Sequence, residues 1–162
     1  MSTIEERLSA LGLVLPEPFQ LPEGMRLPFA WVNVRGDTAY ISGHGPQEAD
    51  GSPAGPYGAV GREVTIEQAQ ESARKVALSM LGDLKRELGD LDRITGWRRV
   101  HGMVNCVPGF TSTPLVINGF TDLIAEVFGP EIGRHARTAV GVCGLPLNFP
   151  VEIEAEVSIS GA

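Results

Sequence analysis

The residues that could do chemistry gather near the end of the sequence, in two strand-like stretches. Arg137 lies in a β-prone run that begins at Ala136. A later run places Glu152, Glu154 and Glu156 at every second position, so their carboxylates lie on one face of a strand. If these two strands pair, Arg137 and one of the glutamates share a single cleft.

An arginine beside a glutamate suits a small substrate that carries a carboxylate. The planar guanidinium can donate two hydrogen bonds to a carboxylate and keeps its charge near neutral pH. The neighbouring glutamate can orient or deprotonate a water molecule. A structural alternative explains the same pattern: Arg137 pairs with a strand glutamate, and the glutamates form an exposed or interface strip. The pattern alone does not decide between the two.

The common cofactor and metal motifs do not occur in the sequence. It has no G-x-x-x-x-G-K-[ST] loop, no dinucleotide fingerprint after a strand, no H-E-x-x-H and no G-x-S-x-G. His44, His101 and His135 share no ligand spacing. Cys106 and Cys143 are far apart and form no C-x-x-C motif, which indicates reduced thiols. We therefore expect neither a metal nor an organic cofactor.

Charge and composition restrict the partners. With 13 Lys and Arg against 20 Asp and Glu, the net charge is −7, which repels polyanions, so we expect no nucleic-acid surface. No apolar stretch approaches the roughly 18 residues of a membrane span, and the acidic start has no apolar leader, so we expect a cytoplasmic protein. The length of 162 residues fits one domain with one core.

The first part of the sequence predicts a helix, a connector, a hairpin and a loop. Thr3 and Glu6 form a capping box for a short amphipathic helix that ends at Gly12. Four prolines make residues 13–28 an extended connector. The hairpin strands are expected at Ala30–Val34 and Thr38–Ser42, and a long glycine-rich loop follows over residues 43–62.

The second part predicts two long helices and three further strands. The first helix runs from a capping box at Thr65 to Gly89, and the second from an N-cap at Thr113 to Gly129 and Pro130. The strands are expected at Ile94–Val107, Ala136–Val142 and Val151–Ile159. This order of elements predicts an α+β domain in which both helices pack on one face of a mixed sheet.

Three motifs resemble, in the right order, those of the RidA/YjgF family, which is also labelled endoribonuclease L-PSP or translation-inhibitor-like. Residues 41–46 resemble its serine-glycine motif after the first hairpin, and residues 116–120 its asparagine-containing helix. Residues 136–155 resemble its C-terminal signature. The resemblance covers about residues 28–158 and is greatest to the longer, YjgH-like branch. It implies a family domain over residues 28–162 behind an N-terminal extension over residues 1–27.

The resemblance also implies a fold, an assembly and a reaction. The fold is chorismate-mutase-like, a mixed sheet backed by two helices, and three copies form a homotrimer with clefts between subunits. In active members the arginine at the position of Arg137 binds the carboxylate of a 2-imino acid. The glutamate at the position of Glu152 helps water attack the imine carbon, and ammonia and a 2-oxo acid leave. The expected substrate-binding residues are Arg137, Ser42, Gly43, His44, Asn118 and Phe29.

Three positions depart from the usual residues of the family. Ala139 stands two positions after the arginine, where active members carry cysteine or threonine. Phe29 lies in the region where a tyrosine is usual, and His44 where glutamine is common.

His44 and Asn118 each keep two interpretations. His44 is a pocket residue that donates or accepts a proton near neutral pH, or a loop residue that packs against Pro46. Asn118 reaches the subunit cleft, or serves as an interface or capping group.

Three functions are therefore considered. The first is a deaminase for 2-imino and 2-enamino acids. The second is a module in which the same trimeric cleft binds a small carboxylate without turnover, which Ala139 favours. The third is the ribonuclease or translation-inhibitor activity of the family label, which the net charge of −7 and the lack of a basic stripe disfavour.

Overall fold

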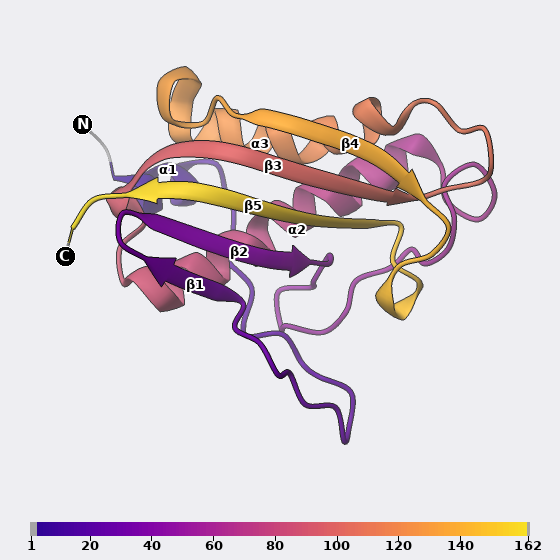
Figure 1. The fold of residues 1–162 in the computed structure, drawn as a ribbon, viewed down its shortest axis with the longest axis horizontal. Helices are drawn as coiled ribbons and strands as arrows, with labels where there is room; N and C mark the ends of the chain where they lie inside the picture. Colours follow the sequence, from indigo (N-terminus) through magenta and orange to yellow (C-terminus); the bar gives the residue numbers. More distant parts are fainter. Residues whose placement is uncertain (1–2, 162) are drawn as a thin grey trace.

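The computed structural model describes residues 3–161, which form a five-stranded sheet with helices on one face (Figure 1). The strand order is β1-β2-β5-β3-β4, and only the β3–β4 pair is parallel. This is the mixed α+β sheet that the sequence predicts. The strands are β1 (Val32–Arg35), β2 (Thr38–His44), β3 (Ile94–Asn105), β4 (Ala136–Val142) and β5 (Val151–Ile159).

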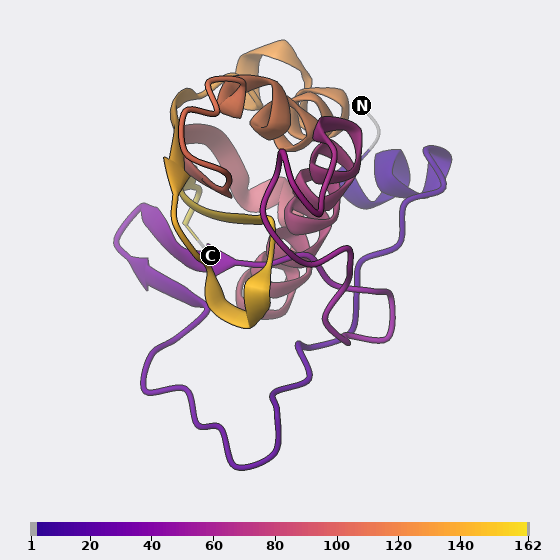
Figure 2. The same ribbon diagram turned by 90° about the vertical axis from the view of Figure 1, so that its right-hand side faces the viewer.

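Two long helices cover one face of the sheet and leave the other open (Figure 2). Helix α2 spans Ile66–Leu88 and α3 spans Thr113–Ile132, while α1 (Ile4–Ala10) packs beside them. Two short 3₁₀ turns, η1 (Leu91–Arg93) and η2 (Pro146–Asn148), complete the elements of the described chain. Within residues 3–161 no helix combines the length and the apolar character that a membrane crossing requires.

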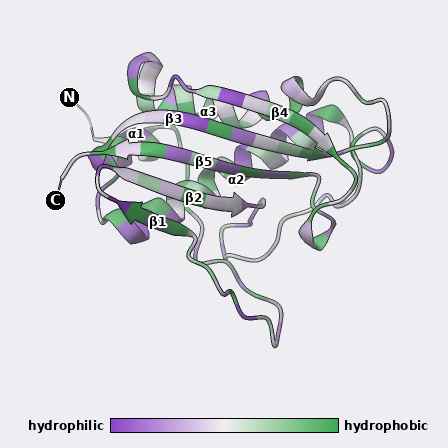
Figure 3. Cartoon of the chain, in the orientation of Figure 1, coloured by the Kyte–Doolittle hydropathy of each residue, from purple (hydrophilic) through white to green (hydrophobic). Residues whose placement is uncertain are grey.

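The alternation of β5 determines which face is buried. Val151, Ile153 and Val157 are fully buried against the helices, whereas the glutamates occupy the positions between them, and Figure 3 shows hydrophobic and hydrophilic residues alternating along β5. Because side chains of a strand alternate between its faces, this pattern directs every second residue of β5 away from the core.

Local signals predicted the helix starts with one exception. The capping boxes at Thr3 and Thr65 are both present. The predicted N-cap at Thr113 is wrong: Ser112 occupies that position without a side-chain bond, and the hydroxyl of Thr113 donates to Ala139 O of β4 at 3.0 Å. The hydroxyl therefore donates to a tertiary acceptor instead of accepting from a backbone N–H of its own helix. The break at Gly129 is confirmed, since its φ of 79° is not helical.

The strands that carry Arg137 and Glu152 do not pair, so the condition under which the two residues would share a cleft within one chain is not met. Strand β3 lies between β4 and β5 and bonds to both. The reason is α3: it forms a crossover from β3 to β4, and a crossover of this kind returns a strand parallel to the first. Strand β5 then joins the free edge of β3 in the antiparallel sense.

The packing of α3 on α2 depends on Gly119. A Cβ at this position would lie 2.0 Å from the carbonyl oxygen of Gln70 in α2. The backbones therefore approach more closely than any side chain allows.

Replacement of Gly119 by alanine should destabilise the protein. We expect Gly119→Ala to lower the free energy of unfolding by about 2–3 kcal/mol, because the added methyl group overpacks a helix interface that cannot yield locally. Chemical denaturation measures the change. Gly96→Ala is the control, since a Cβ there has no neighbour within 4 Å. Equal stability of the two variants would contradict this account of the interface.

Candidate functional site

Arg137 lies on the helix-covered face of the edge strand β4. Its register partner in β3 is the buried Val100. Its Nη1 donates to Thr121 Oγ1 at 2.9 Å, and its Nη2 donates to Pro114 O at 3.2 Å, both in α3. The guanidinium is therefore held between the edge strand and the helix.

A directed chain of hydrogen bonds orients this guanidinium. Burial lowers the pKa of His135, and the nearby Arg137 lowers it further, so the imidazole is neutral. Its Nδ1 lies 2.8 Å from Gly133 O and must carry the proton, so Nε2 accepts from the Thr121 hydroxyl at 3.1 Å. The oxygen of Thr121 is thereby left to accept from Arg137.

The charge of Arg137 has no carboxylate partner among residues 3–161. The structural alternative, in which Arg137 pairs with a strand glutamate, does not hold within one chain. Asn118 is half-buried and lies on α3 between Pro114 and Thr121, at the spacing of one helix face. Arg137, Thr121, His135 and Asn118 thus form one half-site, here called the arginine half-site.

Glu152 lies on the other side of the sheet, at the start of β5. It stands opposite Met103 of β3, and its carboxylate covers Gly43: a Cβ on Gly43 would lie 2.1 Å from Glu152 Oε1. Only glycine allows this approach. Burial raises the pKa of the Glu152 carboxyl, and the charge of Glu154 raises it further, against a smaller lowering by His44.

His44 is 2% exposed and lies behind this carboxylate. Its Nδ1 is 2.6 Å from Ser42 O, and its Nε2 is 3.0 Å from Asp83 Oδ2 in α2. Burial alone would raise the pKa of Asp83, but the hydrogen bonds from His44 and Arg86 outweigh it and lower that pKa. We call Glu152, Gly43 and His44 the glutamate half-site.

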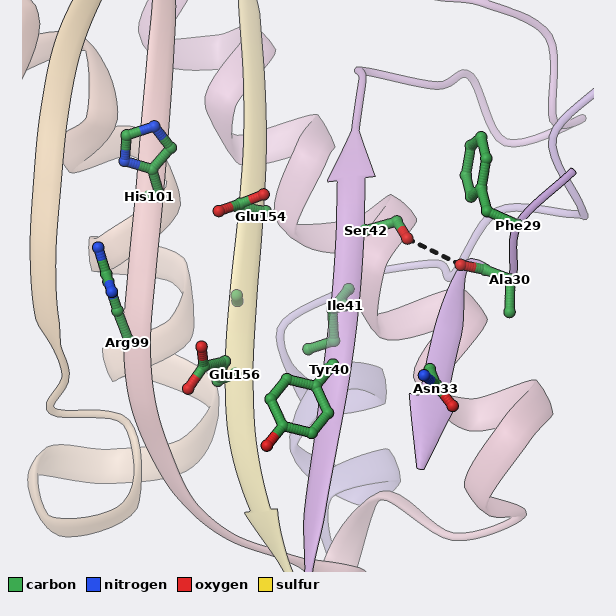
Figure 4. A pocket seen from close by; sticks show the side chains of 11 residues that line it. Phe29, Ala30, Asn33, Tyr40, Ile41, Ser42, Arg99, His101, Glu154 and Glu156 are labelled. Atoms are coloured by element: carbon green, nitrogen blue, oxygen red, sulfur yellow. Dashed lines mark hydrogen bonds between the residues drawn. The ribbon is translucent and has the colours of Figure 1, made fainter. Parts of the chain in front are cut away.

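Ser42 and Phe29 line a cavity of about 390 Å³ on the open face of the sheet (Figure 4). Ser42 Oγ donates to Ala30 O at 2.7 Å, and the ring of Phe29 is 51% exposed. Polar side chains of β3 and β5 form the floor of the cavity. They are Arg99, His101, Glu154 and Glu156.

The two half-sites are apart in a single chain. Arg137 and Glu152 lie two strands and three register positions from one another, which corresponds to about 14 Å between Cα atoms. They also lie on opposite faces of the sheet. One small molecule cannot contact both residues unless a second copy of the chain brings the other half-site to it.

A second cavity, of about 640 Å³, lies at the ends of β3 and β4, where the sequence had predicted no site. Cys106 and Cys143 line it with Asn105 and Asn148. Burial raises the pKa of the Cys106 thiol, which disfavours the nucleophilic thiolate.

One acidic cluster of the described chain has the spacing of metal ligands, and its groups already have partners. Glu5 bonds to Lys85, Asp92 Oδ1 accepts from Ile4 N, and Asp90 caps η1. These contacts fasten α1 to the rest of the domain.

Two residues of the arginine half-site, Thr121 and His135, were not predicted from sequence, and neither was Asp83, the partner of His44. Thr121 carried a usable signal, because it lies three positions after Asn118 on the same helix face. Asp83 carried another, as an acidic residue within the apolar face of a predicted helix. Its partner His44 is 39 positions away, and sequence spacing does not reveal such a pair.

Comparison with known proteins identifies the class to which this fold and these half-sites belong. Residues 5–154 match the family model described as "YjgF/chorismate_mutase-like, putative endoribonuclease", and the chain belongs to this family. The resemblance to RidA/YjgF proteins is thereby confirmed.

Individual relatives agree with this assignment. The chain is 43% identical over 103 residues to protein TCP17 of Trypanosoma cruzi, a match that covers 64% of either chain. A crystal structure of the Agrobacterium tumefaciens protein Atu1372, described as of unknown function, is 40% identical with a TM-score of 0.84, covering 97% of this chain and 92% of that one. A Shewanella oneidensis structure that carries the endoribonuclease name is 29% identical with a TM-score of 0.86, covering 98% and 100%.

The fold is also shared with E. coli TdcF, whose structure contains bound serine. That chain is 16% identical with a TM-score of 0.59, and the alignment covers 91% of this chain and 96% of TdcF. At this identity the likeness shows the fold alone.

The environment of Glu152 predicts a pH-dependent gain in stability when its charge is removed. The pKa of Glu152 in the folded protein is raised above the unfolded value of about 4.3, so folding favours the protonated carboxyl. As the pH rises through the folded pKa, the carboxyl ionises in the folded protein and the free energy of unfolding falls. Glu152→Gln should therefore be more stable at pH 7, by roughly 0.5 kcal/mol because the group keeps some contact with water. The difference should shrink towards pH 4.

Denaturation curves at a series of pH values measure this difference. Glu87→Gln, an exposed change on α2, serves as the control and should show no comparable gain. A gain for Glu152→Gln that is the same at pH 4 and pH 7 would contradict the assigned cause.

Proposed function

We propose that the protein hydrolyses 2-imino acids and their 2-enamino tautomers to 2-oxo acids and ammonia. The observation that carries this proposal is the guanidinium of Arg137, oriented by Thr121 and His135 and without a carboxylate partner in residues 3–161. Such a group fits the carboxylate of a small substrate, because the planar fork matches two carboxylate oxygens.

The reaction needs a base and an acid at the imine carbon. Glu152 takes a proton from water as the water oxygen bonds to the carbon of C=N, and it passes that proton to the nitrogen, which gives a tetrahedral carbinolamine with an amino group. Glu152, again ionised, then takes the hydroxyl proton and passes it to the amino group as the C–N bond breaks, so that ammonia leaves and the carbonyl of the 2-oxo acid forms. A carboxyl whose pKa is raised is a better base than an ordinary glutamate and still donates its proton in the second step.

The proposed site lies between copies of the chain. One copy contributes the arginine half-site and the next contributes the glutamate half-site, and repetition around a threefold axis gives the homotrimer implied by the family resemblance. The separation of Arg137 from Glu152 within one chain supports this division. The open sheet face, with Tyr40 exposed beside Arg99 and Glu156, is a surface that such an assembly could cover.

A second candidate is a carboxylate-binding module without turnover, favoured by Ala139. This residue packs against the core and adds no polar side chain beside Arg137. Arg137 alone is sufficient for binding, and the bound serine of TdcF is an example of a small amino acid held by this fold. The endoribonuclease name of the family has less support, since the net charge of −7 opposes RNA binding.

Ammonia release from freshly generated 2-iminopropionate and bulkier 2-imino acids tests the proposal. Arg137→Ala should lower kcat/KM by about 100-fold or more, because two charge-assisted hydrogen bonds are lost. Glu152→Gln should lower kcat by about 100-fold or more, because general-base catalysis is lost. Arg134→Ala and Glu87→Gln, both exposed, should retain activity. If no imine is consumed faster than in buffer, but Arg137-dependent carboxylate binding is found, the binding module replaces the enzyme.

Mixing the two inactive variants tests the division of the site. When Arg137→Ala and Glu152→Gln chains are unfolded together and refolded, about a quarter of the sites should combine both wild-type residues, and about that share of activity should return. Each variant refolded alone is the control. If both residues of a site came from the same copy, the mixture would stay inactive.

A further inference from the structure

Both ring nitrogens of His44 face hydrogen-bond acceptors. The carbonyl oxygen of Ser42 accepts at Nδ1 and the carboxylate of Asp83 accepts at Nε2, at 2.6 and 3.0 Å. Neither partner has a proton to donate when Asp83 is ionised, so both ring nitrogens act as donors, which is the hydrogen-bonding pattern of an imidazolium. Trp31 lies over the ring with 4.9 Å between centroids, which suits a cation.

The contacts of the buried His44 extend through Asp83 to Arg86 at the surface. Asp83 Oδ1 accepts two hydrogen bonds from Arg86, at 3.1 and 2.8 Å, while its other oxygen binds His44. One carboxylate thus lies between two cations, and its position is fixed from both sides. A buried ion pair of this kind keeps its geometry only if every polar atom has a partner.

The proline-rich connector closes this network. Arg86 Nη1 donates to Pro16 O at 3.0 Å. Glu17 N and Gln20 N donate to Ala49 O and Gly51 O, at 3.0 and 2.9 Å, on the loop that follows His44. Phe19 packs edge-on against Trp31, with 6.0 Å between centroids. Residues 16–20, here called the strap, therefore reach His44 through Arg86 on one side and through Trp31 on the other.

We infer that His44 is a positioning residue for Glu152, and that the strap holds His44 in this role. This inference rests on the proposed function only in taking Glu152 as the base. His44 fixes the Ser42–Gly43 peptide, and the carboxylate of Glu152 lies directly over Gly43. The charge of His44 also offsets that of Glu154 on the carboxylate. A neutral side chain at position 44 would keep the peptide in place but lose the charge.

The other charged or titratable groups around His44 and Glu152 come from three elements, α2, β5 and β3, and they contribute to any pH dependence of the pair. They are Asp83 and Arg86 of α2 and Glu154 of β5, and the titratable His101 of β3 stands opposite Glu154.

The first measurement follows the carboxyl carbon of Glu152 by NMR in protein with ¹³C-labelled glutamate, the signal being assigned by its loss in Glu152→Gln. In His44→Gln the pKa of Glu152 should be higher than in the wild type, since the nearby positive charge is gone. Arg74→Gln removes a positive charge from the outer side of α2, where Arg74 pairs with Glu126, and should leave that pKa unchanged. A folded His44→Gln protein with an unchanged Glu152 pKa would overturn the inference.

The second measurement follows the strap by amide hydrogen exchange. In Arg86→Gln the amides of Glu17 and Gln20 should lose at least tenfold of their protection, whereas Arg74→Gln should keep it. Unchanged protection in Arg86→Gln would refute the part of the inference that concerns the strap.

If His44→Gln does not fold, His44→Gln combined with Asp83→Asn removes both buried charges and leaves an amide pair. It should again raise the pKa of Glu152, because the nearer charge is the one from His44.

The pH profile of ammonia release separates this inference from the proposed function. His44→Gln should move the acid limb of kcat/KM to higher pH with little change in KM, an effect that a general loss of structure does not produce. If the pKa of Glu152 and the exchange rates respond as expected while no variant releases ammonia, the network is confirmed and the deaminase function is rejected.

Discussion

The position of β3 between β4 and β5 is the constraint on which the whole candidate site depends. Helix α3 crosses from β3 to β4 and makes them parallel neighbours, so the last strand can pair only with the other edge of β3. Arg137 therefore faces α3, and Glu152 faces the open side of the sheet. The topology separates an arginine and a glutamate that lie only 15 positions apart in the sequence.

The features that the sequence predicted correctly are those with local causes. Both capping boxes and the break at Gly129 involve groups within four residues of one another, and the alternation of β5 follows from the period of a strand. The order of strands in the sheet, by contrast, depends on residues that are far apart in the sequence. The residues between β4 and β5 are compatible with a hairpin or with a passage over β3, and turn composition does not distinguish the two.

The candidate site shows the same limit. The sequence identified Arg137 and Glu152 as the groups able to do chemistry, because residue type alone restricts what a side chain can do. It did not reveal how they are held. Thr121 and His135 orient the arginine from a helix and a loop, and Asp83 holds His44 from across 39 positions. Tertiary packing brings these partners together. The periodicity of a sequence shows which face of a helix or strand is buried, but not which residues meet across that face.

A split site also has an electrostatic reason. An arginine and a glutamate that met within one chain would form a salt bridge, and a substrate would have to break it before either group could act. On opposite faces of one sheet they cannot neutralise each other. Arg137 keeps a charge without a carboxylate partner in the described chain, and the surroundings of Glu152 disfavour its ionised form. A molecule with a carboxylate next to an electrophilic carbon would satisfy the first group and use the second. In the proposed arrangement the two groups come from different copies of the chain, and the carboxylate of the substrate is the partner of the arginine.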